Sequence, residues 1–181
     1  MDAQTLYQEA LKFAAAKHTE KGQKVPGTEL PYVVHLSNVA MEIIMASADT
    51  GNFDLGFAVQ VALLHDTMED TSTSFSELEH GFGVEIAKAV SSLTKNKELP
   101  QELRLMDCLT RIKKLPAEVW AIKLADRITN LQPPPPDWDR EKRIKYQKEV
   151  RIILGELKDG NAFLARRLEA KIGEYGNYIQ G

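Results

Sequence analysis

Residues 63–70, Leu63-Leu64-His65-Asp66-Thr67-Met68-Glu69-Asp70, decide how the rest of the chain is interpreted. Leu63 and Leu64 are the last residues of an almost wholly apolar segment, 57–64, and the polar residues follow it. Such a segment favours a helix that runs through the interior of the protein. At about 100° per residue on a helix, the His65-Asp66 and Glu69-Asp70 pairs project to one side. Buried carboxylates need a partner, and the neighbouring Lys and Arg residues are too few to pair with them all. This stretch therefore favours a bound cation.

The composition fits one globular domain with a sizeable core, because 43% of the 181 residues are hydrophobic. The formal net charge of −3 gives no general attraction to nucleic acid or to an anionic membrane. The single cysteine, Cys108, excludes an internal disulfide, and residues 1–4 lack the pattern of a secretory signal. No apolar run approaches the roughly 20 residues that span a bilayer. We therefore expect a soluble, cytoplasmic protein without a nucleic-acid or membrane partner. The sequence does not indicate the oligomeric state.

Apolar residues recur at helical spacing along most of the chain, and no useful strand alternation interrupts them, which predicts one all-α domain. Asp2 is the expected N-cap of the first helix, and either Asp137 or Asp139 that of a late one. A capping box over 76–79 opens a short helix, and Pro31 suits the first position of a helix that carries His35 in its second turn. The expected helices cover about 2–18, 31–48, 53–70, 76–80, 84–94, 102–114, 116–131, 162–178 and a stretch from 137 or 139 to 157.

Three separated segments supply a candidate metal set of two imidazoles and two carboxylates. A His-Asp dipeptide alone is a weak signal, but here it closes an apolar helix and is matched downstream by residues 123–127, Lys-Leu-Ala-Asp-Arg. Mixed nitrogen and oxygen ligands suit Mn²⁺, Fe²⁺ or Zn²⁺ and do not favour a thiolate-type structural zinc. The candidate ligands are His35, His65, Asp66 and Asp126.

A set of short motifs extends over nearly the whole chain: Phe13-Ala14-Ala15, His18, Gly22-Gln23, Pro31-Tyr32, His35, Ala62-Leu63-Leu64-His65-Asp66, Glu69-Asp70, Glu77-Leu78-Glu79, Phe82-Gly83, Leu93-Thr94-Lys95, Lys123-Leu124-Ala125-Asp126-Arg127 and Asn130. Together they resemble the HD-domain phosphohydrolases, and within them the hydrolase domain of RelA/SpoT-type alarmone enzymes. The resemblance implies one HD-type alarmone hydrolase domain, 1–181, in which a helical bundle holds the metal between helices. The large family members carry synthetase and regulatory domains after this one. The 181 residues of this sequence leave no room for such domains, so we expect a stand-alone small alarmone hydrolase.

The resemblance also implies a metal-dependent 3′-pyrophosphohydrolase. In the family, a Mn²⁺ ion is held by residues that match the four candidate ligands, and carboxylates that match Glu69 and Asp70 prepare the attacking water. The family removes the 3′-diphosphate of guanosine tetraphosphate (ppGpp) or pentaphosphate as pyrophosphate and leaves the 5′-nucleotide. The residue types agree with this chemistry, because a metal polarises a phosphoryl oxygen and a nearby carboxylate takes the proton from water.

Contacts to the nucleotide are implied in the same way. Lys97 and Arg143 are expected to meet phosphates. The resemblance implies that Asn130 contacts the nucleotide near the ribose. Asn130 also shares a helical face with the candidate metal ligand four residues before it. Tyr146 is expected to lie against the substrate.

One position departs from the family pattern. Members usually carry adjacent Arg and Lys before the Pro-Tyr pair, and the Arg packs against guanine, but this chain has Lys24-Val25. Lysine cannot stack or present a fork of donors as arginine does. We therefore expect the discrimination between guanine and adenine alarmones to be relaxed or even reversed, so that adenine compounds such as (pp)pApp are also substrates. The alternative is that Lys24 makes the same contact with the base more weakly.

Two other functions remain open on sequence grounds. One is a different HD phosphohydrolase reaction, on a nucleoside monophosphate or on the 2′-phosphate of NADPH. The other is a nucleotide-binding sensor without turnover, although the Glu69-Asp70 pair has no use in a protein that only binds. His18 and His80 lie outside the metal set and are expected to be capping or surface residues. Cys108, among apolar neighbours, is expected to be a buried thiol.

Overall fold

The computed structural model describes residues 1–180 and confirms the all-α prediction. Within that range no strand is formed, and the single β-bridge joins Lys24 to Pro31. The helices, in chain order, are α1 (Ala3–Glu20), α2 (Val33–Ala48), α3 (Leu55–Leu64), α4 (Thr67–Asp70), α5 (Phe75–Phe82), α6 (Val84–Leu93), α7 (Gln101–Ile112), α8 (Ala117–Asn130), α9 (Arg140–Leu157), the short 3-10 helix η1 (Lys158–Gly160), α10 (Ala162–Tyr175) and α11 (Asn177–Gln180).

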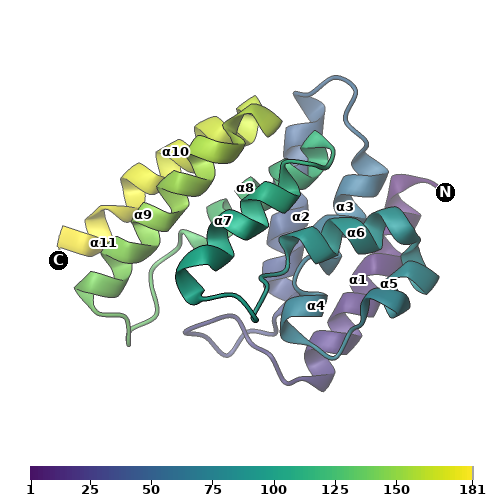
Figure 1. The fold of residues 1–181 in the computed structure, drawn as a ribbon, viewed down its shortest axis with the longest axis horizontal. Helices are drawn as coiled ribbons and strands as arrows, with labels where there is room; N and C mark the ends of the chain where they lie inside the picture. Colours follow the sequence, from purple (N-terminus) through teal and green to yellow (C-terminus); the bar gives the residue numbers. More distant parts are fainter. Residues whose placement is uncertain (181) are drawn as a thin grey trace.

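Helix α3 lies at the centre of the bundle, where it contacts α1, α2, α6 and α8. It is surrounded on several sides, so its sequence is apolar almost all round, and the residues from Val61 to Leu64 are fully buried. The paired helices α9 and α10 pack on α8 and form the C-terminal side of the molecule, away from α1, α5 and α6 (Figure 1). Helix α8 thus lies between the C-terminal pair and the central helix.

The prediction of one helix over 53–70 is wrong, because the chain breaks between α3 and α4 at His65 and Asp66. At the break, Nδ1 of His65 donates to the carbonyl oxygen of Ala62 at 2.8 Å, and Oγ1 of Thr67 donates to that of Leu64 at 2.7 Å. Side chains thus occupy carbonyls that a continuous helix would pair with backbone N–H groups. The break turns Glu69 and Asp70 onto a separate short helix.

Several predicted helix ends are confirmed and two need correction. Asp2 and Asp139 are N-caps whose side chains accept backbone N–H groups, as expected. Helix α5 is capped by Ser74 rather than Ser76, because the Ser74 side chain accepts the N–H of Glu77. Helix α2 begins two residues after Pro31, because Pro31 pairs with Lys24 across the α1–α2 connection. His35 therefore lies in the first turn of α2, not the second.

The turn η1 packs closely on α8, which gives a prediction for stability. A Cβ atom added at Gly160 would lie 2.5 Å from Cβ of Trp120 on α8. We expect Gly160→Ala to lower the free energy of unfolding by about 1–3 kcal/mol through overpacking. Gly155→Ala is the matched control, because a Cβ there meets nothing within 4 Å and alanine favours a helix interior. Urea denaturation of both variants tests this, and equal stabilities would contradict the contact.

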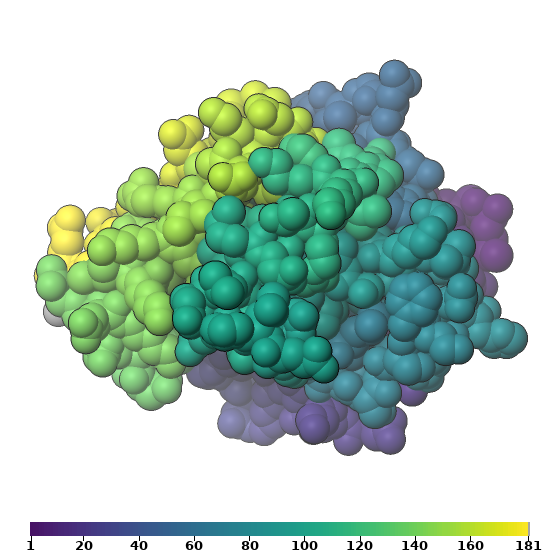
Figure 2. All heavy atoms as spheres, in the orientation of Figure 1, coloured from purple at the N-terminus to yellow at the C-terminus, as the bar shows by residue number. Residues whose placement is uncertain are grey.

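The surface shows the same arrangement of segments. In Figure 2 the C-terminal helices, green to yellow, cover one end of the molecule, and the purple atoms of the connection between α1 and α2 emerge along the lower edge. Among residues 1–180, every helix is too short or too polar to cross a bilayer.

Candidate active site

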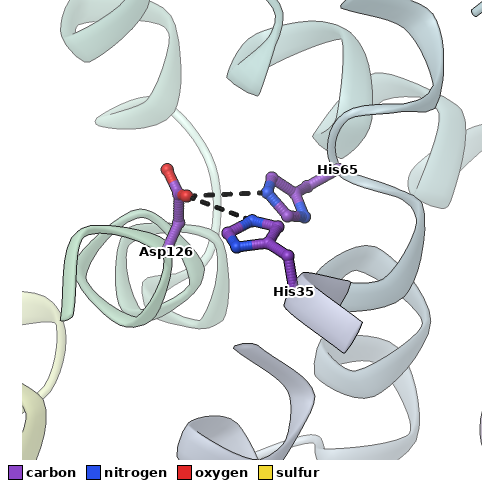
Figure 3. A group of neighbouring side chains, drawn as sticks. All are labelled: His35, His65 and Asp126. Atoms are coloured by element: carbon purple, nitrogen blue, oxygen red, sulfur yellow. Dashed lines mark ion pairs between the residues drawn. The ribbon is translucent and has the colours of Figure 1, made fainter. Parts of the chain in front are cut away.

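Three helical segments bring His35, His65 and Asp126 together (Figure 3). His35 comes from the first turn of α2, His65 follows the last residue of α3, and Asp126 lies in α8. Oδ1 of Asp126 is 3.6 Å from Nε2 of His35 and 3.8 Å from Nε2 of His65. One ligand atom from each residue lies within 4.8 Å of the other two, and all three residues are buried. The predicted ligands therefore meet at one point between helices.

The donor atoms of this group fit a divalent cation. Because Nδ1 of His65 donates to a carbonyl, its Nε2 carries the lone pair that a metal needs. The Nε2 atoms of His35 and His65 are both buried and make no hydrogen bond. Buried polar atoms are rarely left without a partner. Two such nitrogens facing one carboxylate oxygen suit a metal with mixed nitrogen and oxygen ligands.

Asp66, the fourth predicted ligand, lies beside this group. Its Oδ2 is 3.0 Å from Nε2 of His65 and 3.8 Å from Nε2 of His35. The same oxygen accepts a hydrogen bond from the hydroxyl of Tyr32. Tyr32 is the residue before α2, so the start of that helix positions both a predicted imidazole ligand and the hydrogen-bond partner of a predicted carboxylate ligand.

The two oxygens of Asp126 have different surroundings. Oδ2 accepts from Nη2 and Nε of Arg127, at 2.8 and 3.1 Å, and lies 3.6 Å from Nζ of Lys123. Oδ1 faces the imidazoles and accepts from the amide of Asn130 at 2.6 Å. Arg127 and Lys123 therefore hold the carboxylate through Oδ2, while Oδ1 points toward the imidazoles.

The protonation of the cluster also fits a cation. Burial lowers the pKa of His35. Burial alone would lower that of His65 too, but the carboxylates of Asp66 and Asp126 raise the pKa of His65 to about 10. Burial works against the charged form of Asp126, yet Arg127 and the neighbouring imidazole hold the pKa of Asp126 well below its usual range. The negative charge of the two carboxylates causes the rise in the pKa of His65, and a bound cation would balance the same charge.

Glu69 and Asp70 lie outside the cluster of three, and both line a cavity that opens beside it. Oε2 of Glu69 accepts the backbone N–H of Lys95 at 3.0 Å, and Nζ of Lys97 donates to the backbone carbonyl of Glu69 at 2.9 Å. Oδ2 of Asp70 accepts the side-chain amide of Gln23 at 2.8 Å. Burial raises the pKa of Asp70, and the Gln23 hydrogen bond opposes this shift.

A cavity of about 440 Å³ opens beside the cluster, within the range of small-molecule sites. His35, Asp66 and Asp126 lie on its wall together with the two carboxylates of α4. The rest of the wall is largely aromatic and apolar, formed by Val25, Pro26, Leu30, Pro133, Pro134, Pro135, Trp138, Tyr146 and Tyr175, with polar side chains at Thr28, Asn38, Thr129, Asn130 and Gln132. The cavity thus joins a charged end to an end that suits a planar ring.

The five predicted substrate contacts lie in different places. Asn130 and Tyr146 line the cavity. The side chain of Lys24 is half exposed and paired with Glu29, and that of Lys97 is bonded to a backbone carbonyl. Nη1 of Arg143 donates to the carbonyl of Tyr178 at 2.9 Å. Lys24, Lys97 and Arg143 are not among the residues that line the cavity, and their contacts to substrate stay predictions.

The sequence interpretation missed several residues of the site. Arg127 donates to the carboxylate of Asp126, a predicted ligand, but the sequence indicated no role for Arg127 beyond its place at the end of a motif. Trp138 lines the cavity, and its ring packs edge-to-face on Tyr146 at 5.2 Å. The expectation for His18 is wrong: it is 1% exposed and packs on Tyr32, because the connection after α1 folds over it. His80 is exposed and Cys108 is buried, as expected.

Comparisons with known proteins place the chain among its relatives. The HD domain model matches residues 10–157. A guanosine-3′,5′-bis(diphosphate) 3′-pyrophosphohydrolase, MESH1, from Drosophila melanogaster is 32% identical over 167 residues, 90% of each chain. The enzyme of the same name from Aquifex aeolicus is 33% identical over 83% of this chain and 20% of its own length. A solved metazoan orthologue of SpoT, which hydrolyses ppGpp, superimposes with a TM-score of 0.79 at 30% identity, over 94% of this chain and 96% of that one.

Proposed function

Because this chain belongs to the HD-domain family, and within it to the branch of guanosine-3′,5′-bis(diphosphate) 3′-pyrophosphohydrolases, we propose that it hydrolyses ppGpp to pyrophosphate and a 5′-nucleotide. The observation that carries the proposal is the meeting of two unpartnered imidazole nitrogens with Oδ1 of Asp126 at the charged end of a cavity of nucleotide size. This arrangement suits a substrate with phosphates at one end and a base at the other.

In this proposal His35, His65, Asp66 and Asp126 hold a Mn²⁺ ion. When bound, the ion polarises a phosphoryl oxygen and lowers the pKa of water. Arg127 and Lys123 keep the Asp126 carboxylate charged and pointed at the cluster. Mixed imidazole and carboxylate ligands favour manganese over a soft metal that prefers thiolate ligands.

Glu69 and Asp70 manage the proton of the attacking water. Oε2 of Glu69 accepts from the Lys95 backbone, and Oε1, which lies 3.9 Å from Nζ of Lys95, is the oxygen that takes that proton. The water oxygen bonds to the phosphorus nearest the ribose, the bond between this phosphorus and the 3′ oxygen breaks, and the 3′ oxygen takes a proton as pyrophosphate leaves. Asp70 holds the water in line for this attack.

The nucleoside would lie in the aromatic end of the cavity, against Tyr146 and beside Asn130. Lys97 and Arg143 would meet phosphates after their side chains leave the backbone carbonyls they now contact. Charge-assisted bonds to phosphate are stronger than bonds to a neutral carbonyl, which supports this exchange.

We also propose that 1–181 form one catalytic domain and that the enzyme works in the cytoplasm. The HD model covers 10–157, and α10, which lies beyond it, packs on α8 and α9. The lone cysteine, Cys108, is buried and free, as expected of a protein from a reducing compartment.

The test of the function is a nucleotide panel. The purified protein is incubated with ppGpp, nucleoside monophosphates and NADPH, with Mn²⁺ and again with chelator, and the products are separated by anion exchange. Pyrophosphate release from ppGpp that needs Mn²⁺ is the expected result. Inorganic phosphate from a monophosphate or from NADPH alone would indicate another HD phosphohydrolase, and binding without any product would indicate a sensor.

The wall of the cavity supports a prediction for the base. Where the family usually places arginine, Lys24 points to Glu29 rather than into the cavity, and Val25 supplies an apolar contact. We expect kcat/KM for guanine and adenine 3′-diphosphates to differ by less than about 100-fold, because no guanidinium at this position reads the base.

Matched kinetics on ppGpp and its adenine counterpart measure this ratio, and Lys24→Arg serves as the comparison, since it restores the usual side chain. A guanine preference above about 100-fold in the parent, roughly 2.7 kcal/mol in transition-state binding, would show that the base is read elsewhere.

A further inference from the structure

A chain of hydrogen bonds joins the end of α1 to a carboxylate of the active site. Nδ1 of His18 lies 2.6 Å from Oε1 of Gln23, and Nε2 of Gln23 donates to Oδ2 of Asp70 at 2.8 Å. The proposed hydrolysis assigns no role to His18 or Gln23. His18 is almost completely buried, and Gln23 and Asp70 are partly buried, so this set of hydrogen bonds runs from the interior to the wall of the cavity.

The directions of these bonds are fixed by the groups themselves. Since the amide oxygen of Gln23 can only accept, Nδ1 of His18 must carry the proton and donate. The amide NH₂ of Gln23 then has to face Asp70. If the amide were turned over, its oxygen would meet the Asp70 carboxylate, which would place two acceptors against each other. The Asp70 carboxylate therefore determines which end of the amide it meets, and the N–H of the buried imidazole holds the other end in place.

The backbone around Gln23 is held at both sides. Its N–H donates to the carbonyl of His18 at 3.0 Å, and its carbonyl accepts the N–H of Tyr32 at 3.2 Å. Gly22, just before it, has a φ of 65°, a conformation that glycine adopts without strain. The connection between α1 and α2 thus supports two carboxylates, Asp70 through Gln23 and Asp66 through Tyr32.

We propose that Gln23, oriented by His18, is a positioning residue that fixes the Asp70 carboxylate relative to the metal cluster. The inference rests on the proposed function for its kinetic consequence. A carboxylate that aligns water needs a fixed orientation, because an error of about 1 Å costs roughly 100-fold in rate. Gln23 itself touches neither the substrate nor the metal in this account.

The first test replaces the amide and leaves the length of the side chain. Gln23→Met is expected to lower kcat on ppGpp by about 10- to 100-fold, with KM and bound Mn²⁺ near parental values. His18→Phe keeps a ring against Tyr32 and removes the donor, and is expected to lower kcat in the same direction by less. Lys21→Met is the matched control, because Lys21 is exposed in the same turn and is expected to leave the rate unchanged.

A double-mutant cycle separates positioning from general damage to the fold. In an Asp70→Asn background, Gln23→Met should cause no further loss of kcat, because the residue through which Gln23 acts has already been changed. Additive losses, or a parental kcat in Gln23→Met, would overturn the proposal.

Crystal structures of the parent and of Gln23→Met test the contact without substrate. The expected result is an Asp70 carboxylate that rotates or becomes disordered in the variant, while His35, His65 and Asp126 stay in place. An unchanged Asp70 would contradict the inference. A parent that does not hydrolyse ppGpp would instead refute the proposed function and leave this structural comparison decisive.

Discussion

Replacing Asp126 by alanine is expected to abolish both Mn²⁺ binding and ppGpp hydrolysis. Oδ1 of Asp126 faces both buried imidazoles and completes the group of three, while Oδ2 of Asp66 lies beside the same two nitrogens. Loss of a residue that only orients a ligand typically costs about 10- to 100-fold in metal affinity or activity, and loss of a ligand should cost more. His65→Ala should behave in the same way, because it removes one of the two nitrogen donors.

Elemental analysis of the purified variants, together with the rate of pyrophosphate release, measures this effect. Because Asp126→Ala leaves Arg127 and Lys123 without their carboxylate, Asp126→Asn is included as a variant of the same shape. Asp159→Ala, at an exposed position, is the control. Variants of Asp126 or His65 that retain parental metal and turnover would show that the ligand assignment is wrong.

Glu69→Gln is expected to keep the metal and lose turnover. Glu69 lies outside the metal cluster, so the change should leave bound Mn²⁺ and nucleotide affinity intact. The new side chain retains an oxygen that can accept the backbone N–H of Lys95, so its position should be preserved. It cannot take a proton from water, and loss of a general base typically lowers kcat by about 10²–10⁴-fold.

Single-turnover kinetics with saturating Mn²⁺ test this, and Glu79→Gln on exposed α5 provides the charge-matched control. Near-parental turnover in Glu69→Gln would transfer the role of base to Asp70, or to no side chain. Nucleotide binding is measured in parallel, so that a slow hydrolysis step can be distinguished from a failure to bind nucleotide.

Much of the fold is predictable from sequence because the apolar spacing of a helix is local. The break after α3 is not, since no glycine or proline marks it. It depends on where the ring of His65 and the hydroxyl of Thr67 find carbonyl partners. The cap of α5 is a similar case: Ser74 and Ser76 are each followed three residues later by glutamate, and the local pattern alone cannot choose between them.

The metal ligands are easier to predict than the residues that support them. A ligand set is limited to a few residue types, and the sequence predicts His35, His65 and Asp126, which the structure brings together, from such a set. The supporting residues can be of almost any polar type. His18 resembles a helix-end residue in sequence, and only the tertiary position of the α1–α2 connection buries it and brings Gln23 to Asp70.

The most direct test of the central claim is a titration of metal-free protein with Mn²⁺, in which bound metal and pyrophosphate release from ppGpp are measured in the same samples. We predict that the rate rises in proportion to bound Mn²⁺ and that Asp126→Ala shows neither. Full-rate hydrolysis by the metal-free protein, or binding of Mn²⁺ with no pyrophosphate released, would contradict a metal-dependent 3′-pyrophosphohydrolase built on His35, His65 and Asp126.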